Sequence, residues 1–197
     1  MLRAATVVVL FGLRTAWSAC PVSERLPVKL FNDAVIGNDV LGPAKEEARW
    51  LLGSVCVKVE WVPCPLPTIA HHEPCGAPFP AIELHILPSP KTDDIPEAVM
   101  GIAFPTLGSR GNAGVFLSRV AQTVASNVGM ISLPGLLGHV MAHEIGHLLL
   151  KSSAHSSEGL MRADFRPGDL KKAGQRQLKF SPSQSQAIHR NALARER

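Results

Sequence analysis

Short segments in the first two thirds of the chain alternate apolar and polar residues with a period of two. The clearest are Val55 to Val62 and Ala81 to Leu87. A period of two places the apolar side chains on one face of a β-strand. Three further segments have a similar character, and we expect strands in them as well: Pro27 to Ile36, Val99 to Phe104 and Ala113 to Leu117.

Helical patterns lie between and after these strands. Pro43 to Leu52 carries its apolar residues on one side, and Ser118 to Ser126 is a second helical candidate. Near the C-terminus, Ser181 and Gln184 form a capping-box pattern, which predicts a short helix that runs toward Arg195. The pattern therefore favours a fold that combines strands with helices.

The strongest helical pattern begins at Ser132. This residue suits an N-cap, Pro134 suits the first helical position, and helix-favouring apolar residues continue to Leu150. From Leu136 to Leu150 the only polar side chains are those of histidines and Glu144. A helix that is apolar on all sides is buried, and a buried carboxylate beside histidines needs a polar partner.

These polar residues form the motif His143-Glu144-Ile145-Gly146-His147. Positions four apart share one helix face, so the two histidines can bind one metal ion together. Glu144 lies beside the first histidine, where its carboxylate can act as a general base toward a metal-activated water. A chance match of this short motif in a core helix is the alternative interpretation.

A catalytic zinc ion needs three protein ligands and one open position, so a third ligand must come from another segment. Lys151 to Ala154 interrupts the apolar run and can end the helix, and a turn there can bring His155 back to the metal. Glu158 and Asp164 are the competing candidates for this ligand. A glycine-containing turn then leads to Met161.

The motif, the later histidine and the turn that ends in Met resemble the metzincin zinc peptidases, and among them the matrixins. Two departures distinguish this chain from the family pattern. The family's Gly falls at Leu150, and its third His falls at Ser153, so His155 comes two positions late. The span from His143 to Met161 nevertheless matches the matrixin spacing. We therefore interpret the segment as a variant metzincin loop, similar to that of small secreted bacterial relatives.

The resemblance implies an α+β, zincin-like fold with a twisted mixed sheet, a backing helix, an active-site helix and a C-terminal helix. It implies one zinc ion held by His143, His147 and His155, with Glu144 as the general base and Met161 beneath the metal. We therefore expect zinc-dependent hydrolysis of peptide bonds in a protein or peptide substrate.

By the same resemblance, one strand forms the edge of the cleft and pairs with an extended substrate; its residues are Gly101, Ile102, Ala103 and Phe104. The chain has no Tyr, so the transition state would be stabilised by zinc and backbone groups. The late histidine leaves a second interpretation open, an exported zinc-binding protein that has lost catalysis. The presence of Glu144 favours catalysis, because a structural zinc site needs no adjacent base.

Residues 1–19 have the pattern of a secretory signal: Arg3 precedes an apolar stretch, and small residues follow up to Ala19. We expect cleavage there and a single catalytic domain over residues 20–197, secreted or held in the periplasm or cell envelope. An uncleaved anchor, or a lipid on Cys20, is the alternative and would be the only membrane contact.

Four cysteines suit an exported protein in an oxidising environment. Cys64 and Cys75 flank a proline-rich loop, and we expect them to be bonded to each other, while Cys56 could pair with Cys20. The formal net charge of +4 is modest, and no basic and aromatic residues are interleaved. We therefore expect no nucleic-acid partner, and we expect a monomer.

Overall fold

The computed structural model describes residue 20, residues 24–65, residue 75, residues 81–105 and residues 111–194. The expected signal segment, residues 1–19, lies outside this range. The described residues include five strands: β1 (Glu24–Phe31), β2 (Val57–Cys64), β3 (Ile82–Leu87), β4 (Gly101–Pro105) and β5 (Gly111–Phe116). They also include five helices: α1 (Asn38–Gly53), α3 (Leu117–Ser126), α4 (Leu133–Leu150), α5 (Pro167–Gly174) and α6 (Pro182–Leu193).

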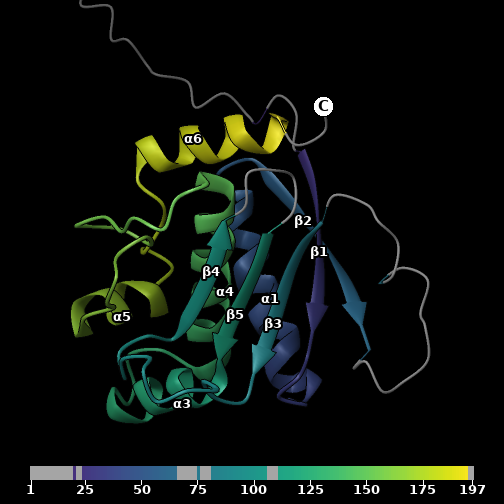
Figure 1. Ribbon diagram of the computed structural model, residues 1–197. Coiled ribbons are helices and arrows are strands. Elements are labelled where there is room, and N and C mark those ends of the chain that lie inside the picture. The colour runs from purple at the N-terminus through teal and green to yellow at the C-terminus, as the bar shows by residue number, and fades with distance from the viewer. Residues whose placement is uncertain (1–19, 21–23, 66–74, 76–80, 106–110, 195–197) are drawn as a thin grey trace, which may run out of the picture.

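The strands form one mixed sheet in the order β2-β1-β3-β5-β4 (Figure 1). All neighbours in this sheet are parallel except β4, which is antiparallel to β5 and occupies the edge. The two longest helices, α1 and α4, cover one face of the sheet (Figure 1). The expected α+β fold with a mixed sheet, a backing helix and a central helix is therefore confirmed.

The core lies between this face of the sheet and the two helices. The alternation of apolar and polar residues along the strands produces this core, because every second residue of a strand points to the same face of the sheet. Leu26, Val28 and Leu30 of β1 are buried, as are Leu51 and Leu52 of α1. The α+β architecture thus follows from the apolar periodicity of each element.

Strands β2, β4 and β5 lie within two residues of the expected bounds, and two boundaries differ by five residues. Strand β1 ends at Phe31 instead of Ile36, because the Asn32 side chain turns the chain. Its Nδ2 donates to the carbonyl of Ile36 at 2.9 Å, and its Oδ1 accepts from the N–H of Ile36 at 3.0 Å. Helix α1 begins at Asn38, and Pro43, which we expected at its start, lies inside it. Helix α5 was not expected from the sequence.

The C-terminal helix α6 begins as the capping box predicts. The Ser181 hydroxyl accepts from the N–H of Gln184 at 3.3 Å, and the Gln184 side chain accepts from the N–H of Ser181 at 2.9 Å. Ile188 is fully buried. Asn191 donates through Nδ2 to the carbonyl of Leu149 at 2.8 Å. These contacts fasten α6 to the C-terminal end of α4.

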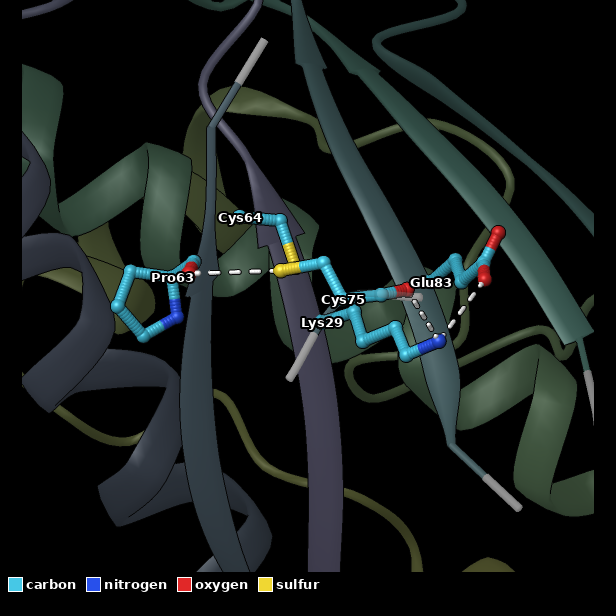
Figure 2. Close-up of a disulfide and its surroundings, with 5 residues drawn as sticks. All are labelled: Lys29, Pro63, Cys64, Cys75 and Glu83. Atoms are coloured by element: carbon cyan, nitrogen blue, oxygen red, sulfur yellow. Dashed lines mark hydrogen bonds and ion pairs between the residues drawn. A yellow bond between two sulfur atoms is a disulfide. The ribbon is translucent and has the colours of Figure 1, made fainter. Parts of the chain in front are cut away.

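Cys64 and Cys75 are bonded to each other, as expected, and Cys20 is bonded to Cys56. Figure 2 shows the first disulfide beside Lys29 of β1 and Glu83 of β3. The Lys29 ammonium donates to the carbonyl of Cys75 at 2.9 Å and lies 3.6 Å from the Glu83 carboxylate. Buried Lys29 therefore ties this disulfide to the face of the sheet opposite α4.

None of the helices in the described part of the chain is long and apolar enough to cross a membrane.

Candidate metal centre

Helix α4 carries the motif through the centre of the molecule. Its start is as expected, since the Ser132 hydroxyl accepts from the N–H of Gly135 at 3.2 Å. Gly138 allows α1 to approach closely, because a Cβ at this position would lie 2.6 Å from the carbonyl oxygen of Ala44. The helix is consequently buried from Leu136 to Leu149.

Three imidazole rings converge at one side of this helix. Nε2 of His147 lies 3.0 Å from Nε2 of His143 and 3.2 Å from Nε2 of His155. All three histidines offer ligand atoms within 4.8 Å of one another. Ligands of a tetrahedral zinc ion, each about 2.0–2.1 Å from the metal, would be separated by roughly 3.3 Å. The donor atoms and their spacing therefore fit a zinc ion.

The two helix histidines are oriented by backbone carbonyl groups. Nδ1 of His143 donates to the carbonyl of Leu160 at 2.7 Å, and Nδ1 of His147 donates to that of Ser152 at 2.8 Å. These bonds leave the Nε2 lone pairs pointing toward one another, which is unfavourable unless a cation lies between them. Burial lowers the pKa of His143 to about 3 and also lowers the pKa of His147. Both rings are therefore neutral near pH 7, the state that binds metal.

The return of His155 depends on the end of α4. Lys151 adopts a left-handed conformation with φ of 53°, and its N–H bonds to the carbonyl of His147. The N–H of Ser152 bonds to the same carbonyl at 3.2 Å. This reversal brings exposed His155 back to the helix. Of the three candidate ligands, the structure joins His155 to the helix pair, and the competitors Glu158 and Asp164 lie outside that group.

Glu144 lies beside the histidines at 4% exposure. Burial raises the pKa of its carboxyl group to about 8. Its side chain packs directly against Gly101 of β4, where an added Cβ would lie 2.5 Å from Oε1. Gly101 thus leaves the space that the Glu144 carboxyl group occupies.

The histidines and Glu144 line a cavity of about 280 Å³. The cavity is also lined by Ala98–Ala103, which includes the first three residues of β4, and by Arg162–Phe165. The carbonyl of Met100 accepts from the N–H of Phe116 in β5 at 2.8 Å. Hydrogen-bonded pairs alternate in antiparallel sheets, so the backbone groups of Gly101 and Ala103 point away from β5. Among the described residues, none pairs with these donors and acceptors along the outer edge of β4. The side chain of Phe104 is 57% exposed.

Two solved structures resemble this arrangement. One is a zinc-dependent peptidase from Methanocorpusculum labreanum, with a TM-score of 0.56 at 16% identity; the match covers 82% of this chain and 99% of that chain. The other is archaemetzincin from Methanopyrus kandleri, with a TM-score of 0.53 at 16% identity; the match covers 85% and 95% of the two chains. The chain has a metzincin-like fold. No protein-family model matches the sequence, and no curated protein matches it.

Met161 packs against helix α4 at Gly146, the residue before His147. It is 1% exposed. A Cβ at Gly146 would lie 2.8 Å from the Met161 sulfur, so this glycine lets the helix lie against the turn. The carbonyl of Met161 accepts from the N–H of Ser156 at 2.8 Å, which links the turn to the residue after His155.

Phe165 and Arg162 are among the cavity residues that were not singled out from the sequence. The ring of Phe165 lies edge-on to His143, with 5.9 Å between centroids. Arg162 follows Met161 directly and is one of the residues that line the cavity. Its position beside Met161 was the only feature of the sequence that could have pointed to Arg162, because nothing in the local spacing distinguishes it from the other basic residues nearby.

Proposed function

We propose that the chain is an exported zinc-dependent endopeptidase of a matrixin-like kind with a variant third-ligand loop. The observation that carries this proposal is the convergence of three imidazole rings next to a buried carboxyl group, within a cavity bordered by the edge strand of the sheet. A structural zinc site would need the histidines but neither the carboxyl group nor the open strand.

His143, His147 and His155 would hold the zinc ion. Zinc in such a site lowers the pKa of an attacking water and polarises the carbonyl group of the scissile bond. Met161 would support the site from below, since its sulfur packs against Gly146 and not among the ring nitrogens.

Glu144 would act as the general base. Its carboxylate would accept the proton of the attacking water and then donate it to the leaving amine. The apolar surroundings that raise its pKa to about 8 when no metal is bound would be offset by the positive charge of zinc, which favours the ionised carboxylate. Gly101 fixes the position of this group by allowing close contact with β4.

The edge of β4 would bind the substrate. The outward N–H and C=O groups of Gly101 and Ala103 would pair with an extended peptide, which would thereby become an additional strand of the sheet. This mode fixes the peptide backbone beside Glu144 without requiring a particular side chain. The exposed Phe104 side chain lies on the opposite face of β4 from Gly101 and Ala103, since alternate residues face opposite ways.

The export part of the proposal has two supports. Both disulfides would persist only in an oxidising environment. The residues before Cys20 have the sequence pattern of a secretory signal.

The substitution Glu144→Gln tests the catalytic assignment, because glutamine keeps the size of the side chain and leaves all three histidines in place. We expect one zinc ion per chain to remain, while hydrolysis of casein or a peptide library falls by about 10²–10⁴-fold, which is the contribution of a positioned general base. Glu60→Gln, on β2 and away from the cavity, is the matched control. A wild-type rate in the Glu144 variant would show that the base has been assigned wrongly.

A further inference from the structure

His155 differs from the other two histidines in how it is held. His143 and His147 belong to a buried helix, and each donates from Nδ1 to a backbone carbonyl. His155 is exposed and lies in a loop, and its ring contacts the other two rings without such a bond within the described part of the chain. Its position therefore depends on what fixes the loop.

The loop that follows His155 is fastened chiefly through Arg162. Ser156 forms a parallel bridge with Arg162. The Arg162 Nη1 group donates to the carbonyl of Ser157 at 2.7 Å, and its backbone N–H reaches the carbonyl of Gly159 at 3.4 Å. The loop that begins at His155 is therefore closed by backbone contacts at Arg162 and by one bond from its guanidinium group to Ser157.

The opposite end of this guanidinium is fixed to helix α5. Nε of Arg162 lies 3.3 Å from Oδ2 of Asp169, and Asp169 is only 9% exposed. Asp169 in turn accepts from the N–H of Arg166 at 3.1 Å, which holds it at the first turn of α5. A continuous set of contacts thus runs from α5 through Arg162 to the loop of His155.

We propose that Arg162 is a positioning residue for the third metal ligand, and that Asp169 fixes Arg162 in turn. This inference rests on the metal assignment of the proposed function. It explains how a histidine two positions late can complete the site. The backbone bridge beside Ser156 shortens the path to Met161, and the Arg162 side chain holds the next residue, Ser157, so that the loop keeps His155 turned toward the helix pair. Arg162 need not touch the metal or the substrate to have this effect.

The guanidinium group suits this task because it is planar and contacts two groups at once. Nη1 donates to the carbonyl of Ser157, and Nε lies 3.3 Å from the carboxylate of Asp169, with which it forms an ion pair. A lysine ammonium is a single point on a flexible stem and cannot occupy both places. Arg162→Lys therefore keeps the charge and removes the clamp.

Zinc affinity, measured by competition with a chromogenic chelator, tests the inference. We expect Arg162→Lys to weaken zinc binding about 10–100-fold, the usual effect of losing a residue that orients a ligand. The visible spectrum of the cobalt-substituted protein should also change, as it should when His155 is replaced. Asp169→Asn, which leaves Arg162 in place, should weaken binding in the same direction but less. Arg190→Lys, an exposed change of the same chemistry on α6, is the control and should bind zinc as the wild type does.

The decisive comparison repeats Arg162→Lys in a His155→Ala background. If Arg162 acts through His155, the second substitution should cause no further loss of zinc affinity. An equal loss in both backgrounds, or wild-type affinity in Arg162→Lys itself, would overturn the inference. The test compares the zinc affinities of variants, and these do not depend on peptide hydrolysis. A protein that binds zinc but cuts no peptide would therefore refute the proposed function, while the test of Arg162 would still apply.

Discussion

Replacement of Gly101 by alanine should separate catalysis from metal binding, because the three atoms nearest to an added Cβ all belong to Glu144. The added Cβ would lie 2.5 Å from Oε1 of Glu144 and 2.8 Å from its Cγ and Cδ. Ordinary carbon contacts are about 3.5–4.0 Å. The Glu144 side chain must therefore move by roughly 1 Å.

A displacement of this size has a large effect on rate and a small effect on stability. A misplacement of about 1 Å can reduce a rate by about 10²-fold, which corresponds to about 2.7 kcal/mol of activation free energy. The clash involves the flexible end of a side chain, and alanine recovers roughly 0.5–1 kcal/mol of backbone entropy relative to glycine in a strand. We therefore expect kcat to fall about 10–100-fold, while the free energy of unfolding changes by less than about 1 kcal/mol.

Peptide hydrolysis, zinc content and urea unfolding, measured on the same preparation, check this expectation. Gly168→Ala is the matched control, because a Cβ at Gly168 meets no atom within 4 Å. Wild-type kcat in Gly101→Ala would refute the reasoning that contact with β4 fixes the base. Loss of zinc together with activity would refute it as well, since the substitution would then act on the metal site.

Two further predictions concern pH and export. In the metal-free protein the pKa of buried Glu144 is about 8, so near pH 7 the folded state retains a proton that the unfolded state has lost. The free energy of unfolding should therefore fall by roughly 1 kcal/mol as the pH rises from about 7 to 8.5. Urea unfolding in the presence of a chelator would measure this fall. A fall of the same size in Glu144→Gln would exclude this carboxyl group as the cause. N-terminal sequencing of exported protein should find Ala19 or Cys20 first, and material that begins at Met1 would contradict the expected cleavage.

The elements with the strongest periodicity were predicted well from the sequence. Helix α4 begins and ends where the cap at Ser132 and the apolar run to Leu150 indicate. Its motif histidines share a face because of helix geometry alone. Local sequence rules suffice in such cases, since a helix cap and a shared helix face each depend on residues within one or two helical turns of one another.

The elements that depend on distant partners were not predicted. Helix α5 has a short apolar pattern, and its buried apolar residues, Leu170 and Ala173, pack only once the loop after Met161 has returned to the helix. The role of Arg162 likewise depends on Asp169, which the fold brings to it. A sequence pattern cannot indicate such a contact, because neither residue is unusual at its own position.

The proposed third ligand, His155, shows most clearly that residue spacing alone does not predict which side chains converge. A count of residues from His147 places the family's third histidine at Ser153, and on that count His155 would miss the metal. The count assumes a particular path out of the helix, and here Lys151 changes that path by adopting φ of 53°. Such a conformation costs a residue other than glycine roughly 1–2 kcal/mol, so neither the turn nor its direction follows from the residue type.

Two bonds to the carbonyl of His147 stabilise the turn, and the ring nitrogen of His155 then lies 3.2 Å from that of His147. Ligand sets are therefore defined by where the chain reverses in space, and a displaced histidine can complete a site that the number of intervening residues would exclude.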